Sequence, residues 1–200
     1  MQAARGTTVA RDPGEEPSTL SAVRARLLLA SIAVILYAVD MVTKVLAVEH
    51  LDGEPDVPLV GDLLVLNLVR NPGAAFSTGT EYTVVLSCLA IVAVLVVLYL
   101  SLRVRSRLWA VALGALLAGV SGNLTDRILR EPGPLRGHVI DFLMLPNWPV
   151  FNIADVCINV AAALILVQAF RGVRLDGTRV PEDEVGDGDE SADHQQERTA

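Results

Sequence analysis

Two aspartates in apolar surroundings are the residues of this sequence best suited to chemistry. Asp141 lies in the stretch Val-Ile-Asp-Phe-Leu and Asp155 in the stretch Asn-Ile-Ala-Asp-Val, and neither has an adjacent basic residue. Two carboxylates brought together at low dielectric cannot both ionise cheaply, so they share a proton and titrate as a pair. One of them can then activate a water molecule while the other protonates a carbonyl or a leaving amine. The two residues therefore indicate hydrolysis by an aspartic mechanism.

Six further polar or charged residues are spaced by three or four positions from one another or from Asp155. Such spacing places side chains on one face of a helix, and opposite charges four residues apart predict an ion pair. Polar and ionisable side chains inside membrane spans cost free energy and are candidates for function. The alternative interpretation is that they lie at the membrane interface and only lock helices together. The six residues are Asp40, Lys44, Asn123, Asp126, Arg127 and Asn152.

The sequence offers little for other chemistries. The histidines outside the C-terminal tail are His50 and His138. No serine lies in a Gly-x-Ser-x-Gly context, and the chain has no HExxH, no phosphate-binding loop and no GxGxxG. A metal site made by His138, Asp141 and Asp155 is the alternative that these residues leave open. We expect neither a metal nor a cofactor.

Four apolar stretches predict an all-α integral membrane protein. Crossing a bilayer takes about 20 residues, and residues 82–102 are 21 consecutive positions without a charge. Residues 63–69, between Gly61 and Pro72, are short and partly β-branched, so they predict a strand or hairpin in a loop. The predicted spans are residues 27–48, 83–102, 108–124 and 150–170.

The net charge of −7 arises in the C-terminal tail. Residues 175–200 hold nine acidic and two basic residues, and the remainder of the chain is neutral. The sequence has no basic patch interleaved with aromatic residues, which argues against nucleic-acid binding. The composition predicts a disordered cytoplasmic tail over residues 1–22, a membrane domain over 23–172 and an acidic disordered cytoplasmic tail over 173–200.

The arginines predict the orientation in the membrane, because Lys and Arg are enriched in cytoplasmic segments next to the spans. Seven arginines lie close to span ends on one side, whereas the loops over residues 49–82 and 125–149 carry four arginines spread over greater length. We therefore expect both termini in the cytoplasm, and the two loops and the polar residues on the outer side. The seven are Arg24, Arg26, Arg103, Arg105, Arg107, Arg171 and Arg174.

Five motifs resemble those of the bacterial lipoprotein signal peptidases, the signal peptidase II family. Residues 40–44 resemble its D-x-x-T/S-K element, and residues 67–77 resemble its N-x-x-x-N-x-G-A-A-F-S signature. Residues 122–127 resemble G-N-x-x-D-R, residues 139–142 resemble V-V-D-F, and residues 151–155 resemble F-N-x-A-D. Five motifs in the family's order, on a four-span hydropathy profile, make this resemblance specific.

The resemblance covers residues 25–170 and implies an aspartic endopeptidase of the bacterial inner membrane. It implies an enzyme that removes the signal peptide from diacylglyceryl-modified prolipoproteins, cutting on the amino side of the lipidated cysteine. By motif position, Asp141 and Asp155 match the two catalytic aspartates, at the outer leaflet. The implied fold adds a small extracytoplasmic β element and a loop helix to the four spans. The implied partners are prolipoprotein substrates and membrane lipids, and we expect a monomer without a cofactor.

Ten more residues match positions that line, order or support the family's active site. Two departures from the family pattern are Met41, where the family often has Gln, and a longer connection between Arg127 and Asp141 that contains residues 131–134. By motif position the residues that line and order the site are Asn123, Asp126, Arg127 and Asn152, and the further polar or supporting positions are Asp40, Lys44, Asn67, Arg70, Asn71 and Gly73.

Two functions from other classes remain as alternatives at this point. A small transporter or ion-conducting bundle could use Asp40, Asp126 and Asp155 as a relay, but it needs polar residues through the whole membrane depth. A non-catalytic assembly protein would not need both aspartates and the surrounding Asn and Arg residues, all of which are present.

Overall fold

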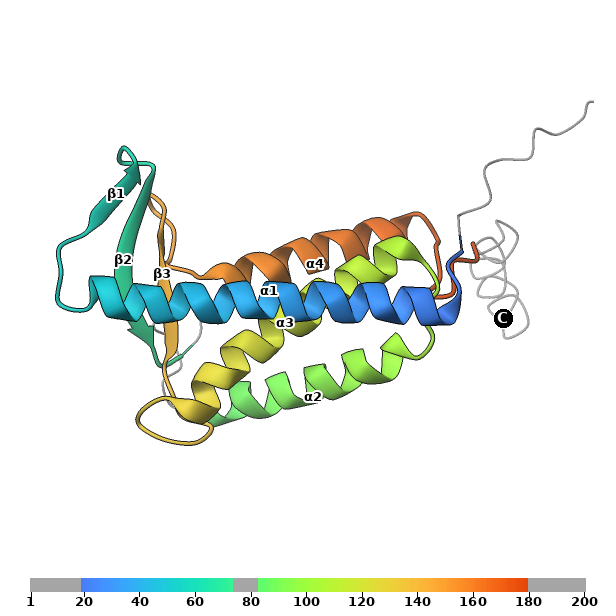
Figure 1. The fold of residues 1–200 in the computed structure, drawn as a ribbon, viewed down its shortest axis with the longest axis horizontal. Coiled ribbons are helices and arrows are strands. Elements are labelled where there is room, and N and C mark those ends of the chain that lie inside the picture. The colour runs from blue at the N-terminus through green and yellow to red at the C-terminus, as the bar shows by residue number, and fades with distance from the viewer. Residues whose placement is uncertain (1–18, 74–82, 180–200) are drawn as a thin grey trace, which may run out of the picture.

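The computed structural model describes residues 19–73 and 83–179, which form four long helices with a three-stranded sheet at one end (Figure 1). All four helices are long and apolar enough to cross a membrane, which confirms the four predicted spans. The helices are α1 (Ala22–Leu51), α2 (Thr83–Ser101), α3 (Arg107–Leu129) and α4 (Ile153–Phe170). The strands are β1 (Val57–Val60), β2 (Leu64–Asn71) and β3 (Val139–Met144).

The helix boundaries differ from the predicted spans where polar residues continue or cap a helix. Helix α1 begins earlier than predicted because the Ser21 side chain caps it, accepting a hydrogen bond of 3.4 Å from the Arg24 backbone N–H. Helix α4 begins at Ile153 rather than at 150 because Asn152 is its N-cap. Residues 74–77 of the predicted signature lie outside the described residues. The loop helix that the resemblance implies does not occur within the described ranges, where the helices are the four given above.

Helix α3 lies at the centre of the bundle and packs against the other three helices. Small residues let the neighbouring backbones approach it closely. A Cβ atom on Gly114 would lie 2.8 Å from the carbonyl oxygen of Leu29 in α1. A Cβ atom on Gly119 would lie 2.4 Å from the carbonyl oxygen of Ala154 in α4. Glycine at these positions therefore sets the distances from α3 to α1 and to α4.

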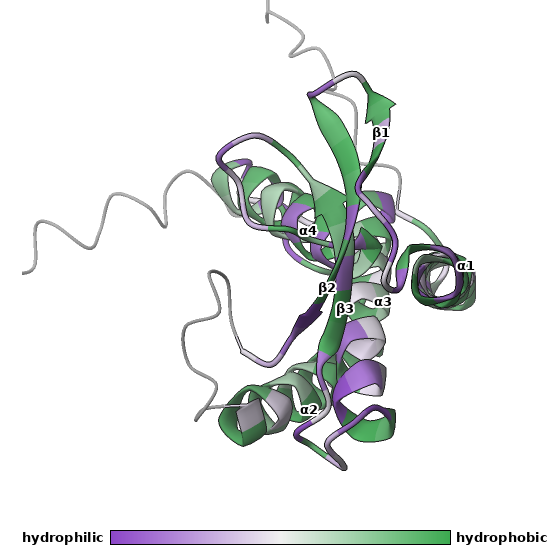
Figure 2. Cartoon of the chain, turned by 90° about the vertical axis from the view of Figure 1, so that its left-hand side faces the viewer, coloured by the Kyte–Doolittle hydropathy of each residue, from purple (hydrophilic) through white to green (hydrophobic). Residues whose placement is uncertain are grey.

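The sheet is antiparallel with the strand order β1-β2-β3, and it lies across the bundle end with α1 on one side and α4 on the other (Figure 2). Successive side chains of a strand point to opposite faces. Ile140 and Phe142 of β3 pack with Ala47 and Leu51 of α1. Asp141, between them in sequence, therefore faces away from α1, toward the side on which α4 begins.

The opposite end of the bundle is closed by a segment that the sequence places in the C-terminal tail. The Arg105 backbone N–H donates to the Leu175 carbonyl at 2.9 Å, and the Trp109 indole N–H donates to the Val173 carbonyl at 2.9 Å. Residues 173–179 are therefore packed on the bundle, contrary to the predicted disordered tail, because their backbone groups pair with the loop between α2 and α3 and with Trp109 of α3. Most of both predicted tails lies outside the described residues.

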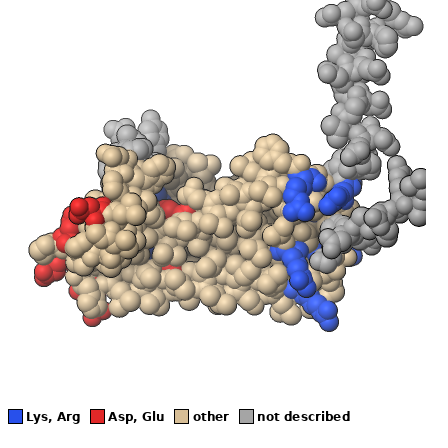
Figure 3. Space-filling view, turned by 90° about the horizontal axis from the view of Figure 1, so that it is seen from above, with Lys and Arg blue, Asp and Glu red and all other residues tan. Residues whose placement is uncertain are grey.

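Charged side chains gather at the two ends of the molecule (Figure 3). On the face shown, most of the visible Lys and Arg lie at the end opposite the sheet, and the visible Asp and Glu lie near the sheet. Between the ends, the surface consists largely of apolar side chains, which include Val34, Ile35, Leu89 and Leu166, each at least half exposed. This pattern fits a bundle surrounded by lipid along its length and by water at its ends.

We predict that Gly122→Ala destabilises the protein. A Cβ atom at this position would lie 2.3 Å from Asp40 Oδ2 and 3.3 Å from the Ala154 Cβ. Overpacking of this kind costs about 1–3 kcal/mol, so the melting temperature in detergent should fall by several degrees. The neighbouring variant Ser121→Ala is the control. Equal melting temperatures for both variants and the wild type would contradict this account of the α1–α3–α4 contact.

Candidate active site

A fully buried lysine joins α1 to α3 at the sheet end of the bundle. The Lys44 ammonium lies 2.9 Å from Asp40 Oδ2 and 2.9 Å from Asp126 Oδ2, and it donates a hydrogen bond of 3.0 Å to Asn123 Oδ1. Exposure is 0 % for Lys44, 1 % for Asp40 and 2 % for Asp126. The predicted Asp40–Lys44 ion pair is confirmed, and Asp126 is a second carboxylate on the same ammonium.

The two carboxylates on Lys44 also hold α4 and β3. Asp40 Oδ1 accepts a hydrogen bond of 2.9 Å from the Ala154 backbone N–H, in the first turn of α4. Asp126 Oδ2 accepts one of 3.3 Å from the Ile140 backbone N–H in β3, and its Oδ1 is paired with Arg130. The groups around Lys44 therefore fix the start of α4 and the position of β3 relative to α1 and α3.

Asp155 lies in the first turn of α4 as part of a capping box. Its backbone N–H donates to Asn152 Oδ1 at 3.0 Å, and its Oδ2 accepts from the Asn152 backbone N–H at 3.1 Å. Its Oδ1 accepts a hydrogen bond of 2.8 Å from Asn123 Nδ2. Because Lys44 donates to Asn123 Oδ1, Asn123 connects the Asp155 carboxylate to the buried ions Lys44, Asp40 and Asp126, and the orientation of this carboxylate depends on them.

Asp141 occupies β3 with its carboxylate between two asparagines. Asn152 Nδ2 donates to Oδ1 at 2.6 Å, and Asn71 Nδ2 donates to Oδ2 at 2.9 Å. Burial raises the pKa of Asp141 from its ordinary value of 3.8 to about 7. The negative charge of Asp155 acts in the same direction, while the hydrogen bonds from the two asparagines oppose the increase in this pKa. Asp141 is therefore half-protonated near neutral pH.

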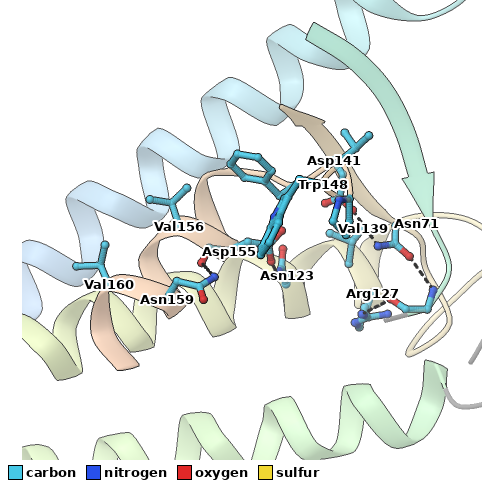
Figure 4. A pocket seen from close by; sticks show the side chains of 14 residues that line it. Asn71, Asn123, Arg127, Val139, Asp141, Trp148, Asp155, Val156, Asn159 and Val160 are labelled. Carbon is cyan, nitrogen blue, oxygen red and sulfur yellow. Dashed lines mark hydrogen bonds between the residues drawn. The ribbon is translucent and has the colours of Figure 1, made fainter. Parts of the chain in front are cut away.

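The two carboxylates line one cavity of about 520 Å³ (Figure 4). Asn152 links them, because its side chain donates to Asp141 while its backbone N–H donates to Asp155. The rest of the lining comes from β2 and the segment that follows it, α3, β3, the connection between β3 and α4, and the exposed face of α4. The lining residues are Asn71, Gly73, Asn123, Arg127, Val139, Asp141, Trp148, Pro149, Val150, Phe151, Asp155, Val156, Asn159 and Val160.

Arg127 brings a positive charge to this cavity. Its Nη2 donates to the Gly73 carbonyl at 3.4 Å, and its buried Nη1 has no hydrogen-bond partner among residues 19–73 and 83–179. The sequence places Asp126 and Arg127 on one helix face and leaves a role in locking helices together as the alternative interpretation. In the structure, Asp126 pairs with Lys44 and Arg130, which leaves the Arg127 guanidinium for the cavity.

Two residues of the predicted supporting set lie apart from both the cavity and the ion cluster around Lys44. Arg70 forms a two-pronged pair with Asp52, with both N···O distances at 2.9 Å, and Asn67 donates to Asp56 Oδ1 at 2.6 Å. These exposed contacts tie β2 to the segment that follows α1. A hydrogen bond from Arg70 lowers the pKa of Asp52 below its ordinary value. Their contacts suit support of the sheet rather than contact with the carboxylate pair.

Some cavity residues were not singled out from the sequence. Trp148 follows β3 and stands exposed at the cavity, and Asn159 lies on α4 one turn after Asp155 (Figure 4). Asn159 could have been found as a polar residue four positions from Asp155 in an apolar span. No pattern in the sequence around Trp148 indicates that its side chain lies at the cavity.

Among the described residues, no group of three or more His, Cys, Asp and Glu side chains could hold a metal ion, so the alternative site with His138 does not assemble there.

We predict that Lys44→Met strongly destabilises the protein. The substitution leaves the buried carboxylates of Asp40 and Asp126 without their shared cation, and breaking a buried pair in this way costs about 3–5 kcal/mol. The double variant Lys44→Met/Asp126→Asn should recover part of this loss, because it removes one of the two uncompensated charges. Thermal unfolding of the three proteins measures the difference, and a double variant that is no more stable than Lys44→Met would contradict the prediction.

We predict that Asp141→Asn raises the thermal stability at pH 7.5. The pKa of Asp141 is about 7 in the folded protein against 3.8 ordinarily, so the folded state holds the proton more tightly than the unfolded state. The contribution of Asp141 to the free energy of unfolding is therefore fully present below about pH 4 and is lost as the pH rises through 7, because ionisation is then easier in the unfolded chain. The advantage of the variant should shrink as the pH falls toward 4, and a pH-independent difference in melting temperature would contradict it.

Comparison with known proteins agrees with the sequence motifs. The family described as signal peptidase (SPase) II, Peptidase_A8, matches residues 32–171. A lipoprotein signal peptidase of Mycobacterium avium (strain 104) is 49 % identical over 153 residues, which are 76 % of this chain and 84 % of that protein. One of Rhodococcus jostii (strain RHA1) is 44 % identical over 169 residues, covering 84 % of this chain and 85 % of the relative.

The fold is likewise similar to a solved structure described as a bacterial membrane enzyme determined by the in meso method at 1.9 Å resolution. The TM-score is 0.63 and the sequence identity 24 %, and the match covers 78 % of this chain and 97 % of that chain. A structure with the corresponding description at 2.3 Å resolution has the same TM-score and identity. The match of the family over most of this chain, together with relatives of this identity and coverage, shows that the chain belongs to the signal peptidase II family.

Proposed function

We propose that this chain removes the signal peptide from diacylglyceryl-modified bacterial prolipoproteins, with Asp141 and Asp155 as its catalytic pair. The bond cut lies on the amino side of the lipidated cysteine. The observation that carries the proposal is the position of the two carboxylates, both on one cavity and both hydrogen-bonded to Asn152. The family assignment supplies the substrate class.

The two carboxylates divide the acid and base work of the reaction. Asp155 takes a proton from water as the water oxygen attacks the scissile carbonyl, and Asp141 gives its proton to the carbonyl oxygen. The tetrahedral intermediate then breaks its C–N bond, and the cysteine nitrogen leaves with a proton from the pair. A pKa of about 7 for Asp141 supports the acid role, because the group retains a proton near neutral pH and can still release it.

The asparagines and Arg127 hold and complement the reacting groups. Asn71 and Asn152 fix both oxygens of Asp141, and Asn123 fixes one oxygen of Asp155. The Arg127 guanidinium, with Nη1 unpaired in the described part of the chain, can donate to the substrate carbonyl oxygen as negative charge develops on it. Preoriented donors of this kind stabilise the transition state without reorganisation of the site.

The membrane setting is part of the proposal. Both termini lie in the cytoplasm and the cavity lies at the outer leaflet, in agreement with the arginines at the bundle end opposite the sheet. The acyl chains of the substrate then remain in lipid while the peptide bond meets water at the interface. Membrane lipids surround the four helices, and the chain acts as a monomer.

Asp141→Asn and Asp155→Asn should each abolish cleavage of a diacylglyceryl-modified prolipoprotein. Loss of a positioned acid or base lowers the rate by about 10²–10⁴-fold. A gel-shift assay on proteins reconstituted in the same lipid measures the effect, with Glu49→Gln, an exposed carboxylate on α1, as the matched control. Cleavage at the wild-type rate by either aspartate variant would contradict the assignment.

The cleavage rate should fall as the pH rises above about 7, because Asp141 then loses the proton that it must donate. On the acidic side the rate should fall again, because a pair in which both carboxyl groups carry a proton has no base left to accept a proton from water. The maximum is therefore expected at neutral to mildly acidic pH. A rate that stays flat between pH 4 and 9 would count against a mechanism with a shared proton.

A further inference from the structure

Helix α4 carries an exposed amide on its otherwise apolar outer face. Asn159 lies four residues after Asp155, between Ile158 and Val160, and it lines the same cavity as the two carboxylates (Figure 4). Four residues of helix correspond to a rise of about 6 Å. Asn159 therefore lies one turn further along α4, on the part of the cavity that leads from the carboxylates toward the middle of the membrane.

The hydrogen bond of Asn159 fixes which way its amide points. Nδ2 donates to the Asp155 carbonyl at 2.9 Å, and since a carbonyl oxygen can only accept, the nitrogen must face the helix and Oδ1 must face outward. Oδ1 has no hydrogen-bond partner among the residues that the structure describes. An amide oxygen without a hydrogen-bond donor costs free energy at membrane depth, and a donor from another molecule would remove this cost.

The substrate of the proposed function contains one class of donor that suits this oxygen. The ester groups of a diacylglyceryl chain accept hydrogen bonds but cannot donate them, so the lipid cannot satisfy Oδ1. Backbone N–H groups of the signal peptide can donate. An extended peptide rises about 3.3 Å per residue, so an N–H that meets Asn159 lies about two residues from a bond cut beside Asp155.

Resting on the proposed function, we propose that Asn159 is a substrate-positioning residue whose Oδ1 accepts a backbone N–H of the signal peptide, about two residues before the cleaved bond. The contact aligns the extended peptide along α4, so that the scissile carbonyl lies between Asp141 and Asp155. The Asn159 side chain takes no part in the proton transfers between water, the substrate and the two aspartates.

The test combines a variant with a change in the substrate backbone. Synthetic diacylglyceryl-modified lipopeptides carry a single ester in place of one amide, which replaces an N–H by oxygen, at each of the four positions before the cysteine. Wild type, Asn159→Leu, which keeps the shape of the side chain, and Asn159→Gln, which keeps an amide, are assayed in the same lipid. Val167→Leu, at an exposed position of α4 outside the cavity, controls for changes in membrane insertion.

We expect Asn159→Leu to raise KM for the all-amide substrate by about tenfold with kcat unchanged, as loss of uniform binding does, and Asn159→Gln to recover most of this loss. One ester position should raise KM for wild type by a similar factor and have no further effect on Asn159→Leu. An unchanged KM for Asn159→Leu, or additive effects at every ester position, would overturn the inference. Failure of the wild type to cleave the all-amide lipopeptide would instead contradict the proposed function, and this inference with it.

Discussion

The buried ammonium of Lys44 is the interaction on which the arrangement of this protein depends. Removing such a charge from water is costly unless its partners surround it with good geometry. Here they are Asp40, Asp126 and Asn123, which come from two helices. Each partner also contacts another element of the site: Asp40 the backbone of α4, Asp126 the backbone of β3 and Asn123 the carboxylate of Asp155. The charge is therefore stabilised only when the helices and the sheet occupy their observed positions, and the same contacts assemble the cavity.

This coupling explains why the two candidate catalytic carboxylates lie on rigid elements in unlike surroundings. Asp155 is held in the first turn of α4, where it takes part in the capping box of its own helix. Asp141 lies on a buried strand between two asparagine side chains. Asn152 contacts both groups, so neither carboxylate can move without disturbing the other. Unlike environments for two nearby acids are a means of separating their protonation states, which is what the proposed division of acid and base work requires.

The sequence predicted the features that are local, such as the four spans and the ion pair of Asp40 with Lys44. It missed the pairing of β2 with β3, which joins segments far apart in sequence, and with it the reason why Asn71 contacts Asp141 while Arg70, its neighbour, faces Asp52. It also could not show that Asp126 shares Lys44 rather than pairing with Arg127. That arrangement argues against the transport alternative, because Asp40 and Asp126 both pair with one ammonium and are not available as a relay. The family, which is one of peptidases, argues against it as well.

The shape of the cavity matches the two-sided nature of the proposed substrate. Its polar end is formed by the carboxylates, the asparagines and Arg127, near the sheet, where water is available. The remainder follows the exposed face of α4, where Val156 and Val160 are 40 % and 48 % exposed and lipid can reach the bound molecule from the side. A peptide bond that joins a membrane-embedded signal sequence to a lipidated cysteine needs both surroundings at once. A soluble cleft would have to extract the acyl chains from the bilayer, at about 0.8 kcal/mol for each CH₂ group, whereas a cavity open to lipid along one helix leaves them where they are.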